Sequence, residues 1–123
     1  MYTLDTNVLI YHLHDERTVR DFVDELAQRQ SPTYISVLTI TELLRFAKLS
    51  PNEESAIAEL LTIFSAISID SQIARAAGGL GRQYGLKLAD SIIAATALFT
   101  GTALVTRNVR DFKRVLSLVV KKI

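Results

Sequence analysis

Short apolar runs that predict strands alternate along the chain with longer segments of helical periodicity. The apolar runs cover residues 2–5, 34–37, 66–69 and 103–106, with a fifth at 118–120. In the segment 16–30 apolar residues recur every three or four positions, which favours an amphipathic helix. Alternation of strands and helices is typical of an α/β domain. We therefore expect a central, mostly parallel sheet of about five short strands flanked by helices.

Proline and glycine mark where the expected helices begin and end. Ser31-Pro32 and Ser50-Pro51 interrupt two segments, and Pro51 suits the first turn of a helix. Gly85 and Gly101 follow two helical segments, at the position where helices often end in a left-handed residue. The expected helices are 6–13, 16–30, 40–49 (capped by Thr39 or Thr41), one from 51 onwards, 71–84, 87–100 and 110–114.

Composition adds few constraints beyond the class of a globular protein. The chain has 123 residues, of which 49% are hydrophobic and 22% charged, and it has no cysteine. We expect a single domain over residues 1–123, with neither disulfides nor a thiolate metal site. No stretch has the pattern of a signal peptide or the roughly 20 apolar residues of a membrane span, so we expect a cytoplasmic protein without a membrane partner. With a net charge of +1, binding of a nucleic acid would depend on a local basic patch.

Asp90 is an acid inside a strongly apolar helical segment. Its neighbours Leu88, Ile92 and Ile93 predict a helix that is buried over most of its surface. Burying an ionised carboxylate there costs on the order of several kcal/mol of folding free energy, unless it is paired with a basic side chain or bound to a cation. The alternative is a first-turn aspartate stabilised by the helix dipole, with Lys87 close by.

Other polar residues follow the ends of expected strands or begin helices. Asp5 ends the first strand, Glu42 lies in the third helix, and Asn108 and Asp111 lie in the turn after the fourth strand. Each has a simpler interpretation as a helix cap, a turn residue or, for Glu42, a partner of Arg45. Ligands of open α/β sheets bind at the carboxyl ends of the strands, so we expect these side chains to lie close together.

Acids that meet without a cation repel one another, and a hard divalent cation removes the conflict. Mg²⁺ and Mn²⁺ prefer carboxylate and water ligands, and a water that they bind can attack a phosphodiester. The only histidines, His12 and His14, are two residues apart in one helix, which disfavours a zinc site. Basic residues lie around the last turn and form either a solvated helix face or a rim that guides phosphates to the acids. These are Arg107, Arg110, Lys113 and Arg114, with Lys121 and Lys122 further on.

Taken together, these motifs resemble the PIN-domain family, and more closely the VapC-type toxins of prokaryotic toxin–antitoxin pairs. The resemblance runs from the first strand to Phe112. It is carried by Leu4-Asp5-Thr6-Asn7, Thr41-Glu42, the segment from Gly85 to Ala97, Val105-Thr106-Arg107-Asn108 and Asp111-Phe112. It implies a Mg²⁺- or Mn²⁺-dependent endoribonuclease that commonly forms a homodimer. It also implies a small antitoxin partner, a tail of which covers the acidic groove.

The resemblance also implies roles for individual residues. Asp5, Glu42 and Asp90 correspond to the acids that hold the metal, and Thr6 and Thr106 to hydroxyls that support the site. Many members have Asp where Asn108 stands, so Asp111 is expected to be the fourth carboxylate. One or two ions, and transfer, ribosomal or messenger RNA as the substrate, all stay open.

Two other functions compete with the nuclease. A receiver-like phosphoacceptor domain has a similar length, and Asp70 after Ile69 could be its acceptor. It would need a second acid beside Asp5, where this chain has Thr6 and Asn7. A catalytically silent PIN-fold interaction module is favoured only by Asn108, whereas retained acids that serve no purpose would be a cost.

Overall fold

A parallel five-stranded sheet forms the centre of the protein in a computed structural model that describes residues 1–123. The strands are β1 (Tyr2–Leu4), β2 (Thr33–Ser36), β3 (Ser65–Ile67), β4 (Ala103–Thr106) and β5 (Val120–Lys122). Their order across the sheet is β3-β2-β1-β4-β5, and every neighbouring pair is parallel. The expected α/β class is therefore confirmed.

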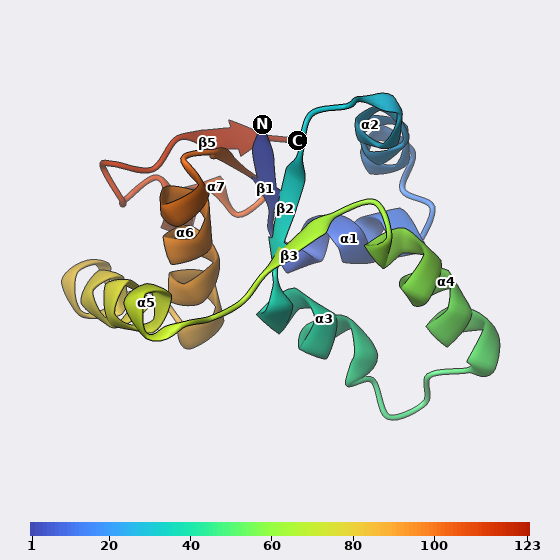
Figure 1. The fold of residues 1–123 in the computed structure, drawn as a ribbon, viewed down its shortest axis with the longest axis horizontal. Coiled ribbons are helices and arrows are strands. Elements are labelled where there is room, and N and C mark those ends of the chain that lie inside the picture. The colour runs from blue at the N-terminus through green and yellow to red at the C-terminus, as the bar shows by residue number, and fades with distance from the viewer.

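Seven helices cover the sheet on both sides (Figure 1). They are α1 (Thr6–Leu13), α2 (Arg17–Gln28), α3 (Val37–Leu44), α4 (Pro51–Leu61), α5 (Ser71–Tyr84), α6 (Leu88–Thr100) and α7 (Val109–Phe112). Helices α1 to α4 lie on one side, and α5 to α7 lie on the other. No helix combines the length and the apolar character needed to cross a bilayer.

Two hydrophobic cores, one on each face of the sheet, explain why the strands are continuously apolar. Side chains alternate between the faces of a strand, so consecutive residues of β4 enter different cores. Val105 packs with Leu4 and Val8 on the side of α1, whereas Leu104 packs with Ile93 on the side of α6. All of these side chains are essentially fully buried. A polar residue in place of Leu104 or Val105 would therefore disrupt one core or the other.

Several helix ends match the expected signals. Pro51 lies in the first turn of α4, behind a capping box formed by Ser50 and Glu53. Gly85 and Gly101 end α5 and α6 with φ of 67° and 65°, in the left-handed region that favours glycine. These expectations are confirmed.

The expected third helix, residues 40–49, was wrong at both ends. Helix α3 begins at Val37 because the Ser36 side chain accepts a hydrogen bond from the Leu38 amide at 3.1 Å, so neither Thr39 nor Thr41 is the cap. It ends at Leu44, since residues 45–48 are exposed and would bury no apolar face as a helix.

Other boundaries shift by one or two residues. The second helix ends at Gln28 rather than residue 30, and α7 covers Val109–Phe112 rather than 110–114. The fifth strand is Val120–Lys122 rather than 118–120, because Leu118 turns into the core beside α6. The edge of the sheet tolerates exposed side chains, so Lys121 can pair there with β4.

Candidate active site

The strand order places a topological switch point between β1 and β4. From β1 the chain proceeds outwards to β2 and β3, and it then returns to form β4 and β5 on the opposite side. Crevices outside the carboxyl ends of the strands at such a point bind ligands. Asp5 follows β1 directly and Thr106 ends β4, so both lie at the crevice.

Asp5 is buried here, with 3% of its surface exposed. Asp5 occupies the N-cap position of α1, as the simpler interpretation expected, but its carboxylate forms no capping hydrogen bond with the helix. Instead, the Thr106 hydroxyl donates to Asp5 Oδ2 at 2.8 Å, while it accepts a bond from the Asn108 amide at 2.9 Å. A hydrogen-bond chain anchored on the backbone therefore fixes one oxygen of Asp5.

The environment of Asp5 disfavours its charge. Burial raises the pKa of Asp5 to about 6, and the negative charges of Asp90 and Glu42 contribute in the same direction. The hydrogen bond from Thr106 opposes this rise in the pKa but does not cancel it. A bound cation would stabilise the ionised form of Asp5 at this position.

Glu42 is held by a chain of hydroxyl groups. Because α3 begins at Val37, Glu42 lies beyond the first turn, and it forms no ion pair with Arg45. The Thr6 hydroxyl donates to Glu42 Oε1 at 2.7 Å. Thr6 also lies 2.8 Å, oxygen to oxygen, from the hydroxyl of Thr39, which is completely buried.

Thr39 is a contact of the site that the sequence reasoning missed, since it considered this residue only as a helix cap. The spacing of three residues between Thr39 and Glu42 could have indicated this contact. Residues three apart lie on one helix face, so Thr39 and Glu42 both face α1.

Asp90 lies in the first turn of α6 and is half-buried. Burial is the main cause that raises its pKa, followed by the charge of Asp111; Lys87 opposes the rise and Glu42 adds to it. The expectation of a helix buried over most of its surface was wrong for its first turn, where Leu88 is 80% exposed. The first turn reaches out of the core towards the crevice, which lets Asp90 meet the other acids.

Asp111 and Asn108 form a pair at the start of α7. The Asn108 side-chain amide donates to Asp111 Oδ2 at 3.0 Å, and Arg114 lies 3.3 Å from Oδ1. Asp111 is close enough to Asp90 to raise its pKa. Both residues of this turn therefore lie at the expected edge, with Asn108 holding Asp111 in place.

The four acids provide oxygen ligands but do not form a tight cage. No group of three His, Asp or Glu side chains is arranged closely enough to hold a metal ion as it stands. No basic side chain forms an ion pair with Asp5, Glu42 or Asp90. An all-oxygen cluster in which three of the four carboxylates have no ion-pair partner has the chemistry that hard divalent cations require, and small side-chain rotations would have to bring the ligands together.

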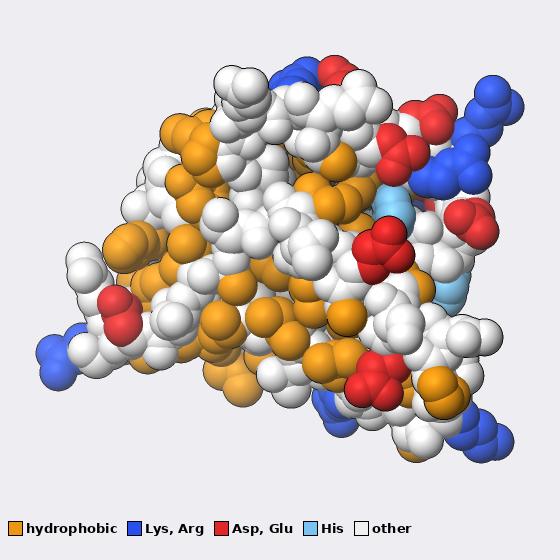
Figure 2. Space-filling view, turned by 45° about the vertical axis from the view of Figure 1, so that its right-hand side comes forward, with side chains coloured by type: hydrophobic (Ala, Val, Ile, Leu, Met, Phe, Trp, Pro, Cys, Tyr) orange, Lys and Arg blue, Asp and Glu red, His pale blue; other side chains and the backbone are white.

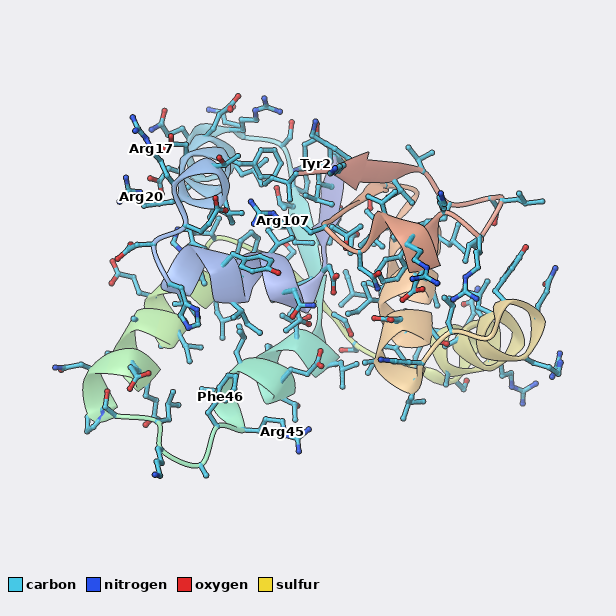
Figure 3. All side chains as sticks on the ribbon, turned by 180° about the vertical axis from the view of Figure 1, so that it is seen from behind. Tyr2, Arg17, Arg20, Arg45, Phe46 and Arg107 are labelled. Atoms are coloured by element: carbon cyan, nitrogen blue, oxygen red, sulfur yellow. The ribbon has the colours of Figure 1, made fainter.

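The basic residues of the last turn are used in different ways. Arg107 lies beside α1 and α2 (Figure 3), where it bonds Glu16 at 2.6 Å and stacks over Tyr11 with its guanidinium carbon 4.7 Å from the ring centre. Arg110 and Lys113 are exposed and form no ion pair. Only the latter two cations, together with those of β5, are free to meet a phosphate without breaking an internal ion pair.

Asp70, the acceptor of the receiver-like alternative, is not part of this site. It follows the edge strand β3 and caps α5 by accepting a hydrogen bond from the Ile73 amide at 2.9 Å. Receiver-like sheets have the strand order 2-1-3-4-5, which differs from the order found here. The receiver-like interpretation was therefore wrong.

The fold is that of a PIN domain. The family model for the PIN domain matches residues 2–116, and the chain belongs to this family. It is similar to Ribonuclease VapC19 of Mycobacterium tuberculosis, with 33% identity over 120 residues that cover 91% of this chain and 92% of that protein.

Solved structures give the same result. A toxin–antitoxin complex from Klebsiella pneumoniae contains a chain that is 31% identical, with a TM-score of 0.83 and complete coverage of both chains. VapBC2 from Rickettsia felis, bound to a DNA fragment from its promoter, matches with a TM-score of 0.82 over 99% of this chain and 98% of that chain. At 23% identity, the latter similarity shows the fold alone.

Proposed function

We propose that this protein is the toxin of a VapBC-type toxin–antitoxin system and an endoribonuclease that depends on Mg²⁺ or Mn²⁺. The similarity to a ribonuclease over most of both chains supports the activity, and the similarity to a toxin–antitoxin complex supports the biological context. The observation that carries the proposal is the buried, unpaired carboxylate of Asp5, which faces Asp90 and Glu42 across the switch point.

In this proposal Asp5, Asp90 and Glu42 hold the ion, and Asp111 is the fourth acid. Thr106 and Thr6 each occupy one oxygen of a carboxylate, which leaves the other oxygen of Asp5 and of Glu42 for the ion or its water. A bound Mg²⁺ or Mn²⁺ lowers the pKa of water and offsets charge on a phosphate. Asn108 carries no charge and acts by orienting Asp111.

RNA would approach along the basic side of this crevice. Arg110 and Lys113 supply cations for its phosphates, whereas Arg107 and Arg114 are engaged with Glu16 and Asp111. We expect Arg110 and Lys113 to affect binding of any RNA, because contacts to phosphates carry no sequence information. We also propose that the protein acts in the cytoplasm.

This protein presents an apolar surface that suits an antitoxin. An apolar groove of about 540 Å³ lies between α1, α3 and α4, lined by residues that include Ile10, Leu43, Phe46, Leu49 and Ile57. Figure 2 shows how hydrophobic side chains gather across one face of the molecule, with charged groups around them. Phe46, which lies just beyond the end of α3 in Figure 3, is 55% exposed. We propose that an apolar helix of the antitoxin packs here.

The proposed homodimer would use a different surface. Phe99 is 52% exposed on α6 and lies at an apolar surface shared with α5. Light scattering of the purified chain, compared with Phe99→Asp, tests this: a dimer that becomes monomeric supports the assignment, and an unchanged mass contradicts it.

The activity is tested by incubating total RNA with the purified chain and added Mg²⁺ or Mn²⁺. Asp90→Asn and Glu42→Gln are the test variants, and Asp21→Asn, which changes an exposed acid of α2 outside every ion pair, is the control. We expect defined fragments from the wild type and the control and a loss of at least about 100-fold in both test variants. Full activity of either test variant would contradict the site, and a wild type that neither cuts RNA nor binds Mn²⁺ would favour the silent interaction module.

A further inference from the structure

The hydroxyl group of Thr39 is buried inside the protein next to the acidic crevice. It lies in the first turn of α3, three residues before Glu42, and none of its surface is exposed. Its oxygen is 2.8 Å from the Thr6 oxygen, and Thr6 is 2.7 Å from Glu42 Oε1. The three side chains therefore form a continuous hydrogen-bonded chain from the core to the crevice.

The direction of these hydrogen bonds follows from the protons available. An ionised carboxylate only accepts hydrogen bonds, so Thr6 donates its single hydroxyl proton to Glu42. The contact between Thr6 and Thr39 then requires Thr39 to donate. Each hydrogen bond strengthens the next, because a hydroxyl whose oxygen accepts a hydrogen bond becomes a better donor through its own O–H group.

Glu42 needs this hydrogen bond because the neighbouring carboxylates repel its negative charge. Asp5 and Asp90 lie near enough for the charge of Glu42 to raise the pKa of both. Glu42 is only half-buried, so its flexible side chain could turn into solvent and escape the repulsion. The Thr6 hydroxyl, which is itself fixed by Thr39, holds the Glu42 carboxylate in the crevice against this repulsion.

We propose that Thr39 is a positioning residue of the metal site, which fixes Thr6 and through it Glu42 Oε1. This inference rests on the proposed function, since it assumes that Glu42 contributes to ion binding. The comparable chain on Asp5 begins at the backbone amide of Asn108, which no substitution removes cleanly. The chain on Glu42 begins at a side chain, so it can be interrupted by removing one oxygen atom.

The test compares Thr39→Val, which keeps the shape but removes the hydroxyl, with Thr39→Ser, which restores it. The matched control is Thr96→Val, because Thr96 is equally buried and its hydroxyl bonds only the Ile92 carbonyl within α6, at 2.8 Å. Binding of Mn²⁺ is measured without RNA, by calorimetry or by electron paramagnetic resonance. Cleavage as a function of Mn²⁺ concentration is measured separately, and thermal unfolding in EDTA monitors the fold.

We expect Thr39→Val to weaken Mn²⁺ binding by about 10-fold, the lower end of the effect of removing a hydrogen bond that orients a ligand. Thr39→Ser and Thr96→Val should bind Mn²⁺ like the wild type. Wild-type affinity in Thr39→Val, or an equal loss in Thr39→Ser, would overturn the inference. If Thr39→Val does not fold, Thr39→Ala removes the same hydroxyl without the branched side chain and is judged by the same criteria.

Glu42→Gln separates this inference from the function on which it rests. If Glu42→Gln loses Mn²⁺ binding while Thr39→Val does not, the role of Thr39 is wrong and the metal site stands. If neither variant changes Mn²⁺ binding, Glu42 is not a ligand and both assignments fail.

Discussion

Replacing Asp5 with Asn should make the metal-free protein more stable while abolishing its activity. The pKa of Asp5 rises from 3.8 to about 6, mainly through burial. At 1.36 kcal/mol per unit, keeping this carboxylate ionised costs the fold about 3 kcal/mol at neutral pH. An Asn side chain can still accept the hydrogen bond from Thr106, but its buried amide hydrogens cost about 1 kcal/mol. We therefore expect a net gain of about 2 kcal/mol in the free energy of unfolding.

The pH dependence distinguishes this origin from better packing. Between pH 3.8 and about 6 the folded protein holds a proton on Asp5 that the unfolded chain has released. The stability of the wild type therefore falls as pH rises through this window and levels off above it. For Asp5→Asn this part of the pH dependence disappears, so the advantage of the variant should be largest at pH 7.5, at about 2 kcal/mol, and only about a third as large at pH 5.

The assay is urea denaturation in EDTA at pH 5 and 7.5, with Asp21→Asn as the exposed control. The control should stay within about 0.5 kcal/mol of the wild type. Added Mg²⁺ should stabilise the wild type, by about 2.7 kcal/mol at 100 times its dissociation constant, and leave Asp5→Asn unchanged. An Asp5→Asn variant that is no more stable than the wild type at pH 7.5 would refute the reasoning that the buried charge is uncompensated.

Three further substitutions test other parts of the structure. Thr106→Val removes the bond that lowers the pKa of Asp5, so the acidic limb of the pH–rate profile should move to higher pH by about 0.5–1 unit; an unmoved limb would show that Asp5 does not govern it. Arg107→Ala loses the ion pair with Glu16 and the contact with the Tyr11 ring, so it should lower the free energy of unfolding, measured in urea, by about 1–2 kcal/mol and leave the KM for RNA unchanged. A raised KM at unchanged stability would instead show that Arg107 contacts RNA. Gly85→Ala places a side chain at φ of 67° and should lower stability by about 1 kcal/mol, and a neutral effect would argue against the left-handed end of α5.

Local signals in the sequence were sufficient for most of the fold. Pro51, Gly85 and Gly101 act on their own backbone, so the ends of three helices could be predicted without knowledge of the neighbours. The start of α3 was predicted wrongly because Ser36 and Thr39 are both plausible caps. Both side chains are buried, and what separates them is the tertiary contact of Thr39 with Thr6, whereas Ser36 accepts the hydrogen bond of the Leu38 amide.

The site shows the same division. The sequence by itself determined which acids were available and that Asp5 ends a strand, because alternating apolar segments predict a parallel sheet and its carboxyl edge. Only the tertiary structure decided what each acid meets: burial and neighbouring charge for Asp5, the hydroxyls of Thr6 and Thr39 for Glu42, and an amide and an arginine for Asp111. The physical reason is distance along the chain. Asp5 and Thr106 are 101 positions apart, and no local pattern records a contact that is made when two strands pair.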